Sequence, residues 1–107
     1  MDDTLAITTA RQQWAQGTRL LEQLRAEDPF AAARCDRVVD GILDELARQV
    51  GQVFTILELA HAYRRAEDWA AAIAHRLAAD APVAWQLSLV QDAAFDRYAR
   101  GARDYEP

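Results

Sequence analysis

The segment FTILEL (residues 54–59) carries two independent signals for the start of a helix. The hydroxyl of Thr55 can accept a hydrogen bond from a free backbone N–H of the first turn, and Glu58 can accept one from the backbone N–H of Thr55. Phe54 and Leu59 are spaced to pack together over the same turn. We therefore expect a helix to begin at Thr55, in the middle of the chain.

The residues before this segment predict a long first helix. Apolar and small side chains recur there every three or four positions, which places them on one helical face. The helix is expected to start near Thr4 or Thr9 and to end near Glu27. Gly17 costs a helix about 1 kcal/mol relative to alanine, so we expect it to mark a close helix crossing. The expected inward residues are Ile7, Ala10, Trp14, Gly17, Leu21 and Leu24, with Leu20 beside them.

A second long helix is expected to follow almost at once. Aspartate is a favoured N-cap and proline is favoured at the first helical position, so Asp28-Pro29 predicts a helix from Pro29 to about Val50. Gly51 is the expected terminator. A short link between two long helices favours an antiparallel hairpin. The expected inward residues are Cys35, Val38, Val39, Ile42, Leu46 and Val50.

The third helix has an uncertain middle. The pattern leaves open whether the helix from Thr55 stops, bends or continues at residues 64–68, and an apolar stripe resumes up to about Ala79. Asp80-Ala81-Pro82 is expected to break the chain, because the residue before a proline avoids helical geometry.

A last helix is expected over residues 83–100, with Gly101 as its terminator. A further capping-box match at Ser88 allows a start one turn later. The remaining residues, 102–107, are predicted to be a frayed tail.

No alternation typical of a strand appears, so the sequence predicts an all-α fold. Residues 1–107 are long enough for one domain with its own core. The expected architecture is a small bundle of four to five helices, in which a long N-terminal antiparallel hairpin has the C-terminal helices packed across it.

Composition and charge narrow the classes of function. The net charge of −5 argues against broad affinity for nucleic acid or anionic membranes, since both need a basic surface. No apolar run approaches the roughly 20 residues that span a bilayer, and the acidic N-terminus is unlike a signal peptide, so we expect no membrane association and a cytoplasmic location. The lack of lysine and asparagine, with abundant alanine and arginine, is typical of a GC-rich bacterial genome.

The last helix is apolar on more than one side. Trp85 lies off its main apolar line, and Leu89 and Phe95 do so in part. Either this helix is the central one of the bundle, or these three residues present an apolar patch to a partner protein or to a second copy of the chain.

An acidic ridge is predicted on the second helix, where Asp36, Asp40 and Asp44 recur every four residues. Like charges at this spacing are mildly destabilising, and Arg37 and Arg48 are placed to relieve the repulsion locally. The ridge is either a solvated face or a docking strip for a basic partner.

Residues that could carry chemistry do not form a recognisable motif. Glu58 and His61 have the spacing found in di-metal helical bundles, but His75, the second histidine, lacks an acidic residue at the matching position. Cys35 is single and reads as a small core residue. No catalytic, cofactor-binding or metal-binding residue is therefore predicted. The sequence favours a protein without enzymatic activity over an enzyme.

Three functions remain as hypotheses. The first is a non-enzymatic protein–protein interaction or adaptor module, which self-associates if the apolar patch binds a second copy of the chain. The second is a DNA-binding regulator of helix-turn-helix type, with a first helix from Thr55 and a recognition helix over residues 67–76. The third is a small metal-binding or enzymatic bundle.

Overall fold

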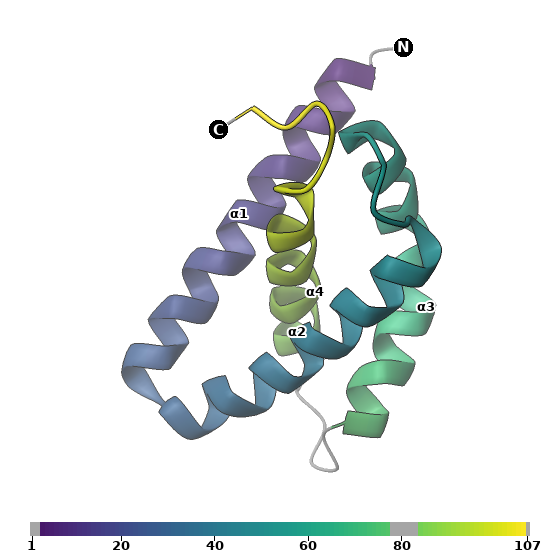
Figure 1. Cartoon of the computed structure of the whole chain (residues 1–107). Helices are drawn as coiled ribbons and strands as arrows, with labels where there is room; N and C mark the ends of the chain where they lie inside the picture. Colours follow the sequence, from purple (N-terminus) through teal and green to yellow (C-terminus); the bar gives the residue numbers. More distant parts are fainter. Residues whose placement is uncertain (1–2, 78–83, 107) are drawn as a thin grey trace.

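The protein is all-α, with four helices over the part of the chain that the structure describes (Figure 1). The structure is a computed structural model that describes the backbone of residues 3–77 and 84–106 and the side chains of residues 7–77 and 86–106. The helices are α1 (Asp3–Glu27), α2 (Pro29–Gln49), α3 (Ile56–Leu77) and α4 (Ala84–Ala99). The predicted fold class is confirmed.

The predicted helix boundaries are confirmed where they rest on capping residues. The backbone N–H of Ala31 donates to the Asp28 carboxylate over 3.1 Å, which caps α2. At α3, the backbone N–H of Glu58 donates to the Thr55 hydroxyl over 3.2 Å, and that of Thr55 donates to the Glu58 carboxylate over 3.1 Å. Gly51 follows α2 with a φ of +83°, a conformation that glycine adopts without strain.

Two open boundaries are resolved. α3 continues without a break through residues 64–68, and α4 begins at Ala84 rather than at Ser88. The expected break at residues 80–82 lies outside the described residues.

The helices surround α4. Figure 1 shows α1 and α2 running in opposite directions from their short link and diverging from it, with α4 between them and α3 beside α2. α4 packs most extensively on α1 and also contacts α2 and α3. The radius of gyration, 13.4 Å, is close to the roughly 13 Å expected for a compact domain of this length.

The central position of α4 corrects the expectation of an exposed patch. Leu89 is 5% exposed and Phe95 is fully buried, so both belong to the core. A helix enclosed by three others needs apolar residues on more than one side. The side chain of Trp85, the third residue of the expected patch, lies outside the described residues.

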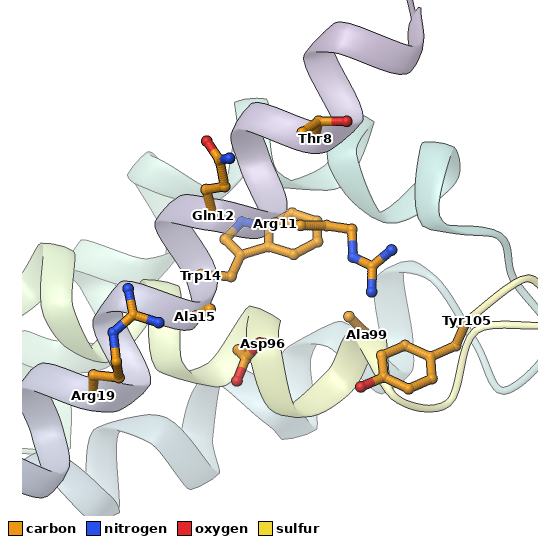
Figure 2. A pocket seen from close by; sticks show the side chains of 9 residues that line it. All are labelled: Thr8, Arg11, Gln12, Trp14, Ala15, Arg19, Asp96, Ala99 and Tyr105. Atoms are coloured by element: carbon orange, nitrogen blue, oxygen red, sulfur yellow. The ribbon is translucent and has the colours of Figure 1, made fainter. Parts of the chain in front are cut away.

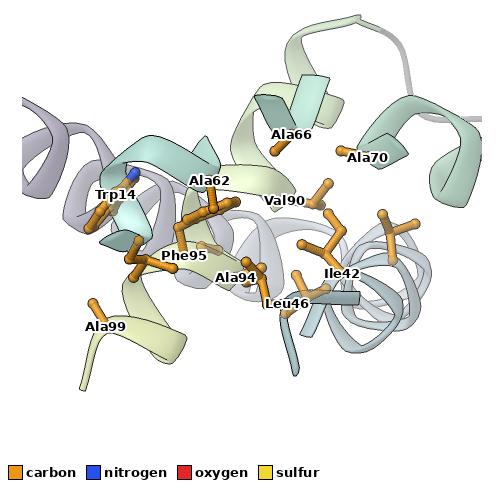
Figure 3. Packing of buried hydrophobic residues seen from close by; sticks show 14 of the residues in the cluster. Trp14, Ile42, Leu46, Ala62, Ala66, Ala70, Val90, Ala94, Phe95 and Ala99 are labelled. Carbon is orange, nitrogen blue, oxygen red and sulfur yellow. The ribbon is translucent and has the colours of Figure 1, made fainter. Parts of the chain in front are cut away.

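The core draws large side chains from every helix (Figure 3). Phe95 is its aromatic centre, with ring centroids 5.6 Å from Trp14, 5.1 Å from Tyr63 and 6.4 Å from Trp69. The largest fully buried residues are Trp14, Ile42, Val38, Val39, Leu46, Leu59, Val90 and Phe95. Leu20, which was expected beside the core, is 42% exposed.

Gly17 marks a close helix crossing, as predicted. A Cβ atom at this position would lie 2.5 Å from the Cβ of Asp92 and 2.9 Å from the backbone nitrogen of Ala93. The backbone of α1 therefore touches α4 there, which a larger residue would prevent.

The C-terminal segment is docked rather than frayed, over its described part up to Glu106. The backbone N–H of Arg103 donates to the carbonyl of Phe54 over 2.8 Å. The carboxylate of Asp104 accepts a hydrogen bond of 2.8 Å from the backbone N–H of Ile56. Asp104 thus supplies a second cap to α3 from the far end of the chain, a contact that local sequence patterns do not reveal.

We expect Asp104→Ala to lower the free energy of unfolding by about 1 kcal/mol, the usual cost of losing a helix cap. Urea denaturation followed by circular dichroism measures this change. Asp68→Ala is the matched control, because Asp68 is an exposed aspartate inside α3 and its loss should change stability by less than about 0.5 kcal/mol. Equal effects of the two substitutions would show that the Asp104 cap contributes nothing.

Candidate functional site

A cavity of about 440 Å³ opens between α1, α4 and the C-terminal segment (Figure 2). We refer to it as the α1/α4 cavity. It combines two guanidinium groups, an amide, two hydroxyls and two aromatic rings with a single carboxylate. The lining residues are Thr8, Arg11, Gln12, Trp14, Ala15, Arg19, Asp96, Ala99 and Tyr105.

One face of α1 supplies the two arginines. Arg11, Ala15 and Arg19 are spaced by four residues, so they lie along the same side of the helix. Eight residues of helix rise about 12 Å, which places the arginines toward opposite ends of the cavity, as Figure 2 shows.

Arg11 already binds a segment of the chain. Its guanidinium donates to the backbone carbonyl of Glu106 over 2.8 Å, and the guanidinium carbon lies 5.4 Å from the centre of the Tyr105 ring. The second distance is within the range of a cation–π interaction. One arginine thus recognises both a main-chain carbonyl and an aromatic side chain.

The charges that line the cavity favour a negatively charged ligand. The Asp96 carboxylate accepts a hydrogen bond of 2.8 Å from Thr18 and lies 3.8 Å from the Arg100 guanidinium. Among the described residues, no carboxylate forms an ion pair with Arg19, which is exposed at the other end. Arg19 is therefore placed to receive an anionic group.

Trp14 forms the buried wall of the cavity. Its ring is fully buried, and its Nε1 finds no hydrogen-bond acceptor among the described residues. An unsatisfied buried donor costs about 1–3 kcal/mol. The tryptophan is held instead by edge-on contact with Tyr63, at 5.7 Å between ring centroids.

The acidic ridge of α2 is partly neutralised by other helices. Arg25 of α1 donates two hydrogen bonds to Asp36, of 2.7 and 3.0 Å, and Arg97 of α4 lies 3.8 Å from Asp40. Asp44 is exposed. A role for the ridge in docking a basic partner stays a prediction.

Arg48 interacts electrostatically with Asp44, as predicted, but it forms its ion pair with a different residue. Arg48 pairs with Glu45 on the same helix, and Gln49 donates to the other oxygen of Glu45 over 2.7 Å. These hydrogen bonds lower the pKa of the Glu45 carboxyl. The rule that residues three or four apart are neighbours allows Glu45 as well as Asp44, so spacing does not choose between them.

The residues considered for metal or DNA binding lie apart from the cavity. Glu58 is engaged in the helix cap with Thr55, and His61 is exposed. No group of three or more histidine, cysteine or acidic residues in the described ranges is arranged to hold a metal ion. The uninterrupted α3 also lacks the turn that a helix-turn-helix unit needs between residues 55 and 76.

The sequence did not single out Arg11, Arg19 or Tyr105. A polar stripe at helical spacing, running from Thr8 to Arg19, is visible in the sequence. Such a stripe is normal on any amphipathic helix, so it becomes informative once the position of the C-terminal segment is known.

No protein-family model matches this chain, and no curated protein or solved structure is significantly similar to it. None of the described helices has the length and apolar character that crossing a membrane requires.

Proposed function

We propose that this protein is a non-enzymatic protein–protein interaction module that binds an extended acidic segment of a partner protein in the α1/α4 cavity. The contact of Arg11 with Tyr105 and with the carbonyl of Glu106 carries the proposal. A guanidinium can bind a backbone carbonyl and an aromatic side chain of a peptide in the same way, and residues 105 and 106 of the chain itself provide the example.

The dimensions of the cavity fit a short peptide. An extended chain advances about 3.3 Å per residue, so roughly four residues cover the 12 Å of helix between Arg11 and Arg19. A peptide that starts at Arg11 and follows α1 would bring an aspartate or glutamate to Arg19, where a bidentate ion pair can form. Charge complementarity, rather than apolar area, would therefore select the partner.

This proposal replaces the apolar patch as the basis of binding. Leu89 and Phe95 are buried inside the bundle, so they offer no exposed surface for self-association. A cytoplasmic location is part of the proposal and is supported by Cys35, a buried free thiol in a chain with no second cysteine to pair with.

We expect peptides selected from a random phage-displayed library to be enriched in aspartate and glutamate. Synthetic versions of these peptides should bind Arg19→Gln about tenfold more weakly than the native protein, a loss of about 1.4 kcal/mol. Isothermal titration calorimetry measures the affinities. Glutamine keeps the polar character of the position and removes the charge.

Arg65→Gln is the matched control, since Arg65 is an exposed arginine on α3 outside the cavity. Its affinity for the peptides should equal that of the native protein. Selected peptides without an acidic bias, no selected peptide at all, or equal losses in both variants would each contradict the proposal.

A further inference from the structure

A half-buried carboxylate lies on the other side of the α1–α4 contact. The hydroxyl of Tyr63 on α3 donates a short hydrogen bond of 2.6 Å to Asp92 on α4. Burial raises the pKa of the Asp92 carboxyl, and the hydrogen bond from Tyr63 offsets this only in part. Burial and the adjacent carboxylate also raise the pKa of Tyr63.

The Asp92 carboxylate has few hydrogen-bond partners for an ionised group. A carboxylate offers about four acceptor positions, and Tyr63 occupies one of them. No arginine of the described residues forms an ion pair with Asp92. Arg64 and Glu67 on α3 line a neighbouring cavity, and neither lines the cavity beside Asp92. The two cavities share Tyr63 and Ser88. A half-buried charge without a counter-ion is costly, and an external cation would relieve that cost.

A cavity of about 340 Å³ gives access to this carboxylate. Gly17 forms part of its wall, at the point where the backbone of α1 packs directly against Asp92. Amides of Gln13 and Gln16 and the aliphatic side chains of Leu20 and Leu89 complete a mixed polar and apolar surface. The lining residues are Gln13, Gln16, Gly17, Leu20, Tyr63, Ser88, Leu89 and Asp92.

We propose that this second cavity binds an ammonium group carried on a short alkyl chain, with Asp92 as its counter-ion. The glutamine carbonyls can accept the remaining ammonium protons, and the leucines can contact the alkyl chain. The cavity is larger than a bare metal ion needs, and part of its lining is apolar. Both properties favour an organic cation. The site is separate from the α1/α4 cavity and does not depend on the proposed function.

The ammonium group must come from outside the chain's own side chains, because the chain contains no lysine. A free alkylamine and a lysine side chain of another protein share this chemistry. n-Butylammonium represents the first source, and N-acetyl-lysine-N-methylamide represents the second. n-Butanol, which has the same carbon chain without the charge, is the matched control ligand.

Amide NMR spectra of the full chain, recorded near neutral pH during titration with each ligand, test the proposal. We expect saturable shifts at Gly17, Tyr63, Ser88 and Asp92 with at least one of the two ammonium compounds and none with butanol. Binding of one ammonium compound at least tenfold tighter than the other identifies the source. Similar affinities assign the site to the ammonium group itself.

Asp92→Asn should weaken binding at least tenfold, because asparagine can still accept the Tyr63 hydrogen bond but carries no charge. Asp68→Asn, an exposed carboxylate on α3, should leave binding unchanged. Ser88→Arg provides a second test that does not disturb the buried pair, since Ser88 is exposed. An arginine at this position, one turn before Asp92, can form an ion pair with the carboxylate and should abolish binding.

The proposal is overturned if neither ammonium compound gives saturable shifts, or if butanol shifts the same amides equally. It is also overturned if folded Asp92→Asn or Ser88→Arg binds as tightly as the native protein.

Discussion

Phe95→Ala is expected to lower the free energy of unfolding by about 3–5 kcal/mol, the usual cost of truncating a buried phenylalanine. Phe95 is fully buried on the central helix, and its ring contacts three other aromatic rings. The lost ring contacts come from both α1 and α3, so the cavity cannot close by a movement of one helix. A domain of this length has a total stability of about 5–15 kcal/mol, and most of it could be lost.

Chemical denaturation monitored by circular dichroism measures this loss. Phe30→Ala is the matched control, because Phe30 is 82% exposed at the start of α2. The same chemical change there should alter stability by less than about 0.5 kcal/mol. Similar stabilities of the two variants would mean that α4 is not the centre of the fold.

Gly17→Ala is expected to destabilise the protein, although alanine is about 1 kcal/mol better than glycine inside an isolated helix. The added methyl group would lie 2.5 Å from the Cβ of Asp92 and 2.9 Å from the backbone nitrogen of Ala93. Backbone atoms cannot rotate away, so α1 and α4 must separate. Overpacking of this kind costs about 1–3 kcal/mol in net terms.

Gly101→Ala tests the same chemical change where space is available. A Cβ at Gly101 would meet its nearest neighbour, the carbonyl oxygen of Tyr98, at 3.5 Å, an ordinary contact. This substitution should raise the free energy of unfolding by up to about 1 kcal/mol, because it restricts the unfolded chain. Thermal unfolding of both variants measures these opposite changes in stability. A stabilised Gly17→Ala would rule out the close crossing.

Local signals in the sequence predicted the helices well. The caps at Asp28 and at Thr55 with Glu58 are set by residues within one turn, and both form as expected. Gly17 was also predictable, because a glycine on the apolar face of a long helix is costly unless another backbone needs the space.

Contacts between helices were not predictable in this way. Periodicity shows that α4 is apolar on more than one side, but it does not show whether a partner or the rest of the chain covers it. The pairing of Arg25 with Asp36 and the capping of Ile56 by Asp104 join different elements, so no spacing rule within one helix reveals them.

Both candidate sites depend on such contacts. The α1/α4 cavity exists because the C-terminal segment lies beside Arg11, and the sequence had suggested a frayed tail there. The second cavity depends on Tyr63 and Asp92, which are 29 positions apart and meet through the packing of α3 on α4. Neither residue belongs to a recognisable motif.

The central position of α4 determines how late in translation the chain can fold. The ribosome makes the N-terminal part of a chain first, at about 5–20 residues per second, and here the element at the middle of the bundle is translated after α1, α2 and α3. Until it emerges, the inner faces of the earlier helices, including the indole of Trp14, remain exposed to solvent. We expect nascent chains that stop before residue 84 to be captured by chaperones or to aggregate, and the native fold to form once α4 and the C-terminal segment that caps α3 have left the ribosome.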